Sequence, residues 1–547
     1  MIILNELIYE INKVLKKLNV HESVEVRISN NQEYDFQINN FVKYQKHEKI
    51  KELSVSISKI LSNCKALEEY NITKNYFINL KINFKDIVPI IQNIEEHIKK
   101  SNNEKIIIDY GGPNIGKPLH VGHLRSLNIG RSLYSINVLA GNDVKSDIHL
   151  GDWGMPVAQI INYCSKKNIS IEDLKIDELV KIYPNASKLS NEDEEFYKNS
   201  QDINKKLNNL DDDVTVKWKM LKNLSLLSIK HALNKLNHDF DLWLGESDVN
   251  HLIPNMLKSL EKNNKIAPDD GAYISTMETD PKILITKSDG SYLYLTTDLA
   301  TVQNRLNNED FDKILYVVDN RQKFHFEQLF ESLVYFEFEE KHYEHVAFGT
   351  VNDKNGNPFK TRDGDTKQLL ELFDETYEHI KKVNPKLEDE TLKTLANSVL
   401  TFSDLLTNRK TDYKFDLEKF TNISGKTGLY VQYALVRAKK LYEKSQLEND
   451  EIRFNFLEFD ENDKNLFRAF CKFEIYFKQS LEQNEPHHLA EFLYSISIHF
   501  NRLYQADNIL NNKNETIKLN KLFLCSIFIK YSEILMKALG ITPVDKM

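Results

Sequence analysis

Residues 105–126 read KIIIDYGGPNIGKPLHVGHLRS. A short apolar run ends at Tyr110, a glycine turn follows, and a helical pattern extends from about His120 to Ala140. Strand, glycine turn and helix in this order open a nucleotide-binding α/β unit. The segment therefore predicts a parallel sheet with a nucleotide site at the glycine turn.

The flanking sequence divides the chain into three predicted domains. Residues 1–100 mix helical periodicity with alternating strands, which indicates a small α+β domain. Residues 101–385 hold the α/β pattern, with a mostly helical, charged insertion over about 165–275. Residues 386–547 keep helical periodicity alone and predict an α-helical bundle. The strands expected after KIIIDY are VKSDIHL, KILITK, YLYLTT, KILYVVD and HVAFGTV.

The composition excludes several classes of protein. The 547 residues include 72 Lys and Arg against 81 Asp and Glu, which argues against a nucleic-acid binder with a whole basic face. Any RNA contact must then rest on local patches, stacking or shape. No run reaches the roughly 18 to 20 apolar residues that a bilayer span needs, and the N-terminus reads as an amphipathic helix rather than a signal peptide. These features, together with scattered cysteines, predict a cytoplasmic protein with free thiols and no structural metal.

The glycine turn allows two interpretations. Gly111, Gly116 and Lys117 have the spacing of a phosphate-binding P-loop, but the next position is Pro118, which lacks the hydroxyl and the backbone N–H that a P-loop uses there. In the other interpretation, His120 and His123 bind the nucleotide. Two histidines three apart lie on one face of a helix N-terminus, which favours anions such as ATP phosphates. For this pair alone, capping and packing is the competing role.

The motif PN-x-x-K-x-x-H-x-GHLRS resembles the arginyl-tRNA synthetase version of the HIGH signature of class I aminoacyl-tRNA synthetases. Further segments resemble blocks of the same family in the same order, over roughly residues 105–547: HLGDWG (149–154), YLYLTTDLA (292–300), YVVDNRQKFHFEQLF (316–330), NGNPFKTRDGDT (355–366), LTNRKTDYKFD, SGKTGLYVQYALVRA and LGITPVDKM. The resemblance implies a Rossmann-type catalytic domain over 101–385, an N-terminal tRNA-contacting domain and an α-helical anticodon-binding domain.

By this resemblance the chain is an arginine–tRNA ligase. It would use ATP, with Mg²⁺ accompanying the nucleotide, L-arginine and tRNA(Arg), and it would be a monomer. A hypothesis from a different class is a synthetase-like paralogue that binds tRNA or arginine as a regulator or serves a tRNA-dependent side pathway.

The resemblance also implies roles for the nucleotide-site residues. His120 and His123 would contact the phosphates, with Lys117 adding positive charge. The ATP-binding residues would be Pro113, Gly122, His149, Gly151, Asp152 and Gly154. In the loop NGNPFKTRDGDT, Thr361 stands where the KMSKS motif has its second lysine. The mobile cation would therefore be Lys360 or Arg362, unless this loop is only a solvated basic turn.

A guanidinium substrate calls for a planar carboxylate and an aromatic wall. Tyr294 and Asp298 are four residues apart, and if Asp298 opens a helix this spacing lets the ring and the carboxylate face one pocket. The resemblance assigns them to the guanidinium, and Asp109, Asn114 and Gln322 to the α-amino and carboxylate ends of arginine. An N-cap role for Asp298 is the alternative.

In the C-terminal bundle, Tyr430 and Tyr433 offer stacking surfaces for unpaired bases, with Arg437 near the phosphates. Aromatic residues three apart can equally belong to the helical core. Lys426, Leu429 and Leu435 depart from the residues that the family has at these positions, so this domain differs most from the family pattern.

Overall fold

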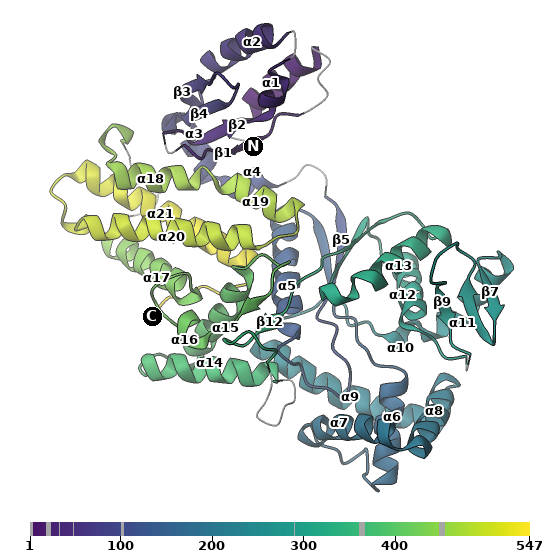
Figure 1. Ribbon diagram of the computed structural model, residues 1–547. Helices are drawn as coiled ribbons and strands as arrows, with labels where there is room; N and C mark the ends of the chain where they lie inside the picture. The colour runs from purple at the N-terminus through teal and green to yellow at the C-terminus, as the bar shows by residue number, and fades with distance from the viewer. Residues whose placement is uncertain are drawn as a thin grey trace. The chain divides into compact units, whose positions relative to one another are not determined.

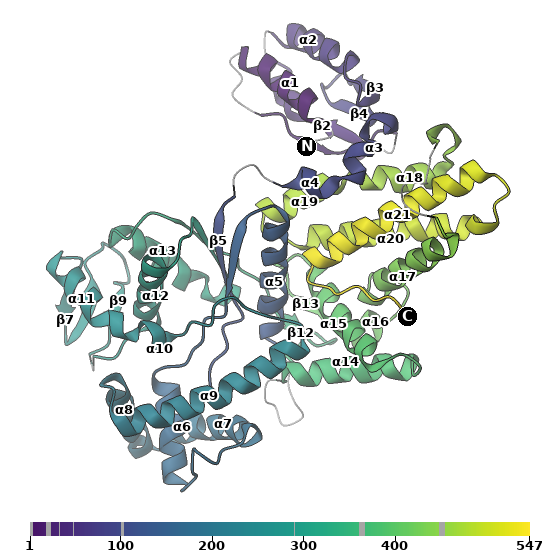
Figure 2. The same ribbon diagram turned by 180° about the vertical axis from the view of Figure 1, so that it is seen from behind.

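The computed structural model describes residues 4–17, 23–31, 33–46, 49–99, 103–288, 290–359, 367–447 and 455–547. The chain forms two compact units. One, which we call the sheet unit, comprises residues 102–386 and 395–421. The other, the helical unit, comprises residues 1–101, 387–394 and 422–547. Figure 1 and its reverse view, Figure 2, show the elements of each unit.

A parallel sheet forms the centre of the sheet unit, with strand order β11-β10-β5-β6. Its strands are β5 (Lys105–Tyr110), β6 (Asp143–Asp147), β10 (Lys313–Val317) and β11 (His342–His345). The predicted strand, glycine turn and helix are present, since α5 (His123–Leu139) follows β5. Ile106, Ile107 and Ile108 are buried. Such a continuous apolar run is typical of a parallel strand that is covered on both faces.

Helices follow β6, and all of them except α6 lie within the insertion predicted over about 165–275. Their bounds are α6 (Met155–Lys166), α7 (Ile176–Glu192), α8 (Glu194–Asn208), α9 (Asp212–Lys235), α10 (Glu246–Val249) and α11 (Ile253–Lys262). Figure 1 shows α6, α7, α8 and α9 gathered in one group, which encloses an apolar core that includes Val157, Ile161 and Leu221. The chain then forms a small antiparallel sheet of β7 (Ile266–Asp269), β8 (Ala272–Ser275) and β9 (Leu284–Thr286).

Three of the predicted strands differ from the structure. YLYLTT is mostly helix, because α12 (Tyr294–Asn308) begins inside it and buries Leu295, Leu299 and Val302 at helical spacing. KILITK contributes β9 to the small sheet and not to the parallel one. HVAFGTV is split between the end of β11 and β12 (Val351–Asn352), which pairs with β13 (Tyr413–Lys414).

The sheet unit is completed by α13 (Lys323–Tyr335), α14 (Leu369–Val383), the C-terminal part of α15 (Asp389–Leu405) and α16 (Leu417–Phe420). Residues 395–421 therefore group with the parallel sheet, whereas the domain boundary predicted from the sequence lies at residue 386. Buried polar contacts explain the difference, because Arg125 of α5 forms an ion pair with Asp404 of α15.

The helical unit combines an antiparallel sheet with a helical bundle. The sheet has strand order β1-β2-β4-β3, and the bundle contains α17 to α21. Tyr531 of α21 donates a hydrogen bond to the Ile91 carbonyl of α3 (3.2 Å), which connects the two parts. The elements are α1 (Asn5–Lys17), β1 (Val26–Ile28), β2 (Phe36–Ile38), α2 (Ile50–Ser62), β3 (Leu67–Ile72), β4 (Ile78–Ile82), α3 (Phe84–Gln92), α4 (Ile94–Ile98), α17 (Gly428–Ser445), α18 (Glu461–Phe470), α19 (Phe473–Glu482), α20 (His487–Ala506) and α21 (Glu515–Ala538). Among the described residues, no helix is long and apolar enough to cross a membrane.

Candidate active site

A cavity of about 780 Å³ lies at the carboxyl ends of β5 and β10. This is the edge of a parallel α/β sheet at which ligands bind. Ten residues singled out from the sequence line it: Asp109, Asn114, His120, Gly122, His123, His149, Gly151, Tyr294, Asp298 and Gln322. Pro113, Lys117, Asp152 and Gly154 lie outside its lining.

The glycine turn after β5 is fixed by hydrogen bonds. Gly111 and Gly112 have φ values of 92° and 47°, a region that favours glycine. The Gly111 N–H donates to Ser126 Oγ (2.8 Å), and that hydroxyl donates to the Val317 carbonyl (2.7 Å). The turn is thus held against both α5 and β10 at the cavity wall.

The His120 and His123 rings lie side by side, with centroids 4.0 Å apart. The Gly122 N–H donates to His120 Nδ1 (3.1 Å), and the His120 N–H donates to His123 Nδ1 (3.1 Å). Desolvation and the neighbouring His120 lower the pKa of His123 to about 3. Desolvation, Lys117 and Arg321 also lower the pKa of His120. Both rings are therefore neutral at pH 7. With Nδ1 accepting, the His120 ring carries its proton on Nε2, whereas Nδ1 of His123 also lies 3.2 Å from the His120 carbonyl, so its role as donor or acceptor depends on the tautomer.

The segment HLGDWG packs against the chain that precedes the histidines. The Gly151 N–H donates to the Pro113 carbonyl (3.0 Å), and the Ile115 N–H donates to the Gly151 carbonyl (3.1 Å). A Cβ on Gly151 would lie 2.1 Å from Asn114 Oδ1, so a larger residue would displace the Asn114 side chain. Nδ1 of His149 is buried and has no hydrogen-bond partner among the described residues.

Asp152 and Gly154 make their contacts outside the lining of the main cavity. The Asp152 carboxylate is buried, forms an ion pair with Lys222 (2.5 Å) and accepts from the Ser247 hydroxyl (2.7 Å). Gly154 lines a separate cavity of about 170 Å³, which shares Glu246 and Tyr294 with the larger one.

Asp109 lies at the end of β5, where its carboxylate pairs with the fully buried Arg305 (2.5 Å). Arg305 also contacts Asp147 (2.6 Å). Burial alone would lower the pKa of Arg305, but Asp109 and Asp147 hold that pKa well above its ordinary value. Arg305 thus fixes the carboxylate of Asp109 at the cavity wall.

Tyr294 and Asp298 lie one turn apart on α12 and both line the cavity. Tyr294 is 72% exposed, so its ring is accessible to a ligand in the cavity. The helix begins at Tyr294 with Leu293 as its N-cap, so Asp298 is not an N-cap residue. Its carboxylate instead contacts Nε2 of His325 on α13 (2.6 Å).

The sequence-based site omitted several cavity residues. His325 holds Asp298, and its position within the quoted block KFHFEQ could have identified it. Glu246 stands in no motif; desolvation, Asp152 and Asp298 raise its pKa to about 8. Arg321, which forms a fork-like pair with Asp319, and Phe348 also line the cavity.

Of the three cations predicted to bind phosphate, the structure describes only Lys117. Nζ of Lys117 lies 4.1 Å from the centroid of the Tyr183 ring on α7, outside the cavity lining. Lys360 and Arg362, together with Thr361, lie outside the described residues.

The predicted tRNA contacts are in the helical unit, on α17. Tyr430, Tyr433 and Arg437 are each partly exposed, so neither tyrosine is a fully buried core residue. The guanidinium of Arg437 lies 4.1 Å from the Tyr433 ring centroid and donates to the Tyr433 hydroxyl (3.0 Å). The Tyr430 ring lies 5.4 Å from that of Tyr494. Leu429 and Leu435, which depart from the family pattern, are buried.

Comparison with known proteins supports the resemblance seen in the sequence. Residues 87–417 match the family model of the class I tRNA synthetase (R) catalytic domain, and residues 431–547 match the DALR anticodon binding domain. An arginine–tRNA ligase from Francisella tularensis is 34% identical over 470 residues, which are 81% of each chain. One from Alkaliphilus oremlandii is 32% identical over 522 residues, or 89% of each chain.

Solved structures show the same fold. The arginyl-tRNA synthetase of Plasmodium falciparum has a TM-score of 0.85 at 24% identity, covering 100% of this chain and 99% of that one. The arginyl-tRNA synthetase of Thermus thermophilus has a TM-score of 0.79 at 18% identity, covering 99% and 100%.

Proposed function

Because this chain belongs to the arginyl-tRNA synthetase family, we propose that the 780 Å³ cavity is where it activates arginine with ATP. The protein is an arginine–tRNA ligase, which joins arginine to the 3′ end of its tRNA. One observation carries the assignment: a neutral histidine pair at a helix N-terminus and a tyrosine–aspartate pair on a second helix face the same cavity.

In the activation step, a carboxylate oxygen of arginine attacks the α-phosphorus of ATP. A P–O bond forms, the bond to the pyrophosphate oxygen breaks, and arginyl-adenylate and pyrophosphate result. Because little covalent help is needed, positioning and charge stabilisation supply the catalysis. The Nε2–H groups of His120 and His123 donate to phosphate oxygens, and His149 and Gly151 contact the nucleotide. Mg²⁺ accompanies ATP as part of the substrate.

The arginine side chain lies along α12 in this proposal. Asp298 pairs with the guanidinium, while the exposed ring of Tyr294 covers its face. His325 orients the Asp298 carboxylate from the opposite helix. Asp109, Asn114 and Gln322 hold the α-amino and carboxylate groups. Pro113 and Gly122 shape the nucleotide side through the backbone, whereas Asp152 and Gly154 act from outside the cavity lining and do not contact the reacting atoms.

Glu246 gives a prediction about pH. At pH 7 it is protonated in the free enzyme, because its pKa is raised to about 8. A bound guanidinium favours the ionised form and neutralises Asp298, so arginine binding should lower this pKa and release a proton. Calorimetry of arginine binding at pH 7, in buffers of different ionisation enthalpy, measures the release.

Glu246→Gln should abolish that proton release. An equal release from the variant would show that another group titrates. Absence of any arginine binding by the wild-type chain would contradict the proposed function itself.

Lys117 gives a second prediction, since Thr361 replaces the usual KMSKS lysine. Lys117→Ala and Lys360→Ala should each slow adenylate formation, and the double variant should lose less than the sum of the two free-energy changes if both act on one transition state. Pre-steady-state measurement of adenylate formation provides the rates.

Lys230 offers a matched control, because its Nζ also lies over an aromatic ring, Trp243 (4.7 Å), and it too lies outside the cavity lining, but it belongs to no nucleotide-site motif. Lys230→Ala should leave the rate unchanged. A wild-type rate for Lys117→Ala would mean that the loop alone provides the charge.

We propose that α17 contacts the anticodon of tRNA(Arg). Tyr430 and Tyr433 would stack on unpaired bases, with Arg437 near a phosphate. A restricted contact of this kind suits a chain with a net charge of -9. We also propose that the protein works as a monomer in the cytoplasm, where tRNA charging takes place.

Tyr433→Ala should weaken tRNA charging by about 5- to 150-fold, which corresponds to a stacking energy of about 1 to 3 kcal/mol per base. Tyr433→Phe retains the ring and should lose much less. Aminoacylation rates over a range of tRNA concentrations measure the effect.

Phe473→Ala serves as the core reference, because Phe473 is 1% exposed and such truncations cost about 3 to 5 kcal/mol. A comparable loss of thermal stability in Tyr433→Ala, with unchanged tRNA affinity, would assign Tyr433 to the core.

A further inference from the structure

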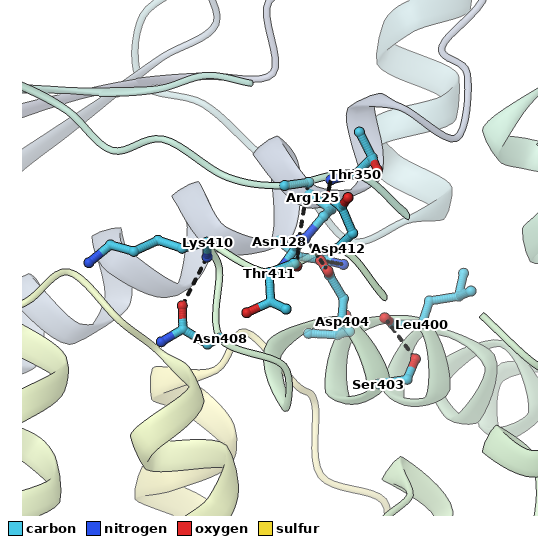
Figure 3. Close-up of polar contacts among 12 residues, drawn as sticks. Arg125, Asn128, Thr350, Leu400, Ser403, Asp404, Asn408, Lys410, Thr411 and Asp412 are labelled. Carbon is cyan, nitrogen blue, oxygen red and sulfur yellow. Dashed lines mark hydrogen bonds and ion pairs between the residues drawn. The ribbon is translucent and has the colours of Figure 1, made fainter. Parts of the chain in front are cut away.

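Arg125 is a buried cation directly behind the proposed nucleotide site. It lies two residues after His123 in α5, and its side chain is 1% exposed. Nε donates to Asp404 (3.0 Å), and Nη1 donates to the carbonyls of Gly349 (3.1 Å) and Thr411 (2.7 Å). Figure 3 shows Arg125 between Asp404 and the segment that carries Thr411.

The segment that Arg125 holds includes a wall of the cavity. Phe348, next to Gly349, lines the cavity, and its carbonyl accepts from the Asn320 N–H (3.0 Å). Asn320 begins the short helical turn that ends at the cavity residue Gln322. On the other side, Asp412 accepts from the Thr350 N–H (2.6 Å), as Figure 3 shows.

An arginine suits this place better than any other residue. Two carbonyls and a carboxylate are satisfied here by Nε and Nη1 of one planar guanidinium, whose fixed geometry a lysine ammonium does not reproduce, while Nη2 is buried without a hydrogen-bond partner among the described residues. Apolar residues often stabilise a core as well as a buried ion pair does. Stability alone therefore does not explain a charge at this position.

We propose that Arg125 is a positioning residue for adenylate formation, which sets Phe348 and the histidine pair at a fixed spacing on the nucleotide side of the cavity. The proposal rests on the role of His120 and His123 in the proposed function. A misplacement of about 1 Å can cost roughly 100-fold in rate, so the loss should appear in kcat and in the KM for ATP. The arginine KM should change less than the ATP KM, because Asp298 and Tyr294 stand on α12, and Arg125 reaches only one arginine-side residue, Gln322, through Phe348 and Asn320.

The test compares Arg125→Met and Arg125→Lys with wild type in arginine-dependent ATP–pyrophosphate exchange at saturating tRNA, with the folded fraction measured by thermal denaturation. Arg125→Met should lose about 100-fold in kcat per folded molecule. Arg125→Lys keeps the charge opposite Asp404 but not the fork, so it should remain folded and still lose activity.

Lys521→Met is a matched control. Lys521 is also 1% exposed and is paired with a buried carboxylate, but it lies in α21 and not in α5. It should lower the melting temperature and leave kcat unchanged. If Arg125→Met does not fold, Arg125→Lys decides the question. A wild-type kcat in the folded Arg125→Lys, or an equal rise in the KM values for arginine and ATP, would overturn the proposal. Failure of the wild-type protein to catalyse exchange would instead refute the proposed function.

Discussion

His123→Ala is expected to lower the rate of arginine-dependent pyrophosphate exchange by roughly 100-fold or more. Removing one preorganised donor to the transition state typically costs about 2.7 to 4 kcal/mol. The His123 ring is neutral because its pKa is lowered to about 3, so its contribution is a hydrogen bond from a neutral ring and not a full charge. The exchange rate should therefore show no titration of His123 between pH 5 and 9.

Two further variants test which nitrogen donates. The side-chain amide of glutamine reaches approximately the position of Nε2, whereas that of asparagine lies near Nδ1. His123→Gln should consequently retain more activity than His123→Asn. Near-wild-type exchange by a folded His123→Ala would favour a capping and packing role, and greater activity in the asparagine variant would contradict the Nε2 assignment.

Asp298→Asn should raise the KM for arginine by about 30-fold or more, because losing one partner of an enclosed charge pair costs about 2 to 5 kcal/mol. The KM for ATP should stay near the wild-type value, since Asp298 lies on α12, away from the histidine pair on α5. Steady-state exchange with each substrate varied in turn measures both constants.

His325→Asn provides a graded comparison. It removes the imidazole that orients Asp298 (2.6 Å) but leaves the carboxylate in place, so the arginine KM should rise less than in Asp298→Asn. Equal increases for arginine and ATP in Asp298→Asn would contradict the specificity role of this residue.

The sequence predicted local features well because they depend on neighbouring residues. The run KIIIDY, the glycine turn and the histidine helix lie within 22 consecutive positions, 105–126. The resemblance singled out Tyr294 and Asp298, although the strand predicted at YLYLTT was wrong. An alternation of tyrosine and leucine over a few residues does not distinguish a strand from a helix that buries Leu295 and Leu299.

Contacts between distant segments were not predictable in the same way. Arg125 and Asp404 are 279 positions apart, and Arg305 and Asp109 are 196 apart. Glu246 becomes part of the site because the segment before α10 runs alongside β6. There the Leu242 N–H donates to the Ser146 carbonyl (2.9 Å). Neither periodicity nor a motif marks such a return, and it depends on the packing of the whole insertion.

Arginine-dependent ATP–pyrophosphate exchange by the purified wild-type chain, with and without tRNA(Arg), tests the central claim most directly. We expect exchange with arginine and none with lysine, because the Tyr294 ring and the Asp298 carboxylate match a planar guanidinium and not an ammonium group. Transfer of labelled arginine to tRNA should accompany it. Absence of arginine-dependent exchange under both conditions, in a folded protein that still binds tRNA or arginine, would contradict this account and favour a synthetase-like regulator.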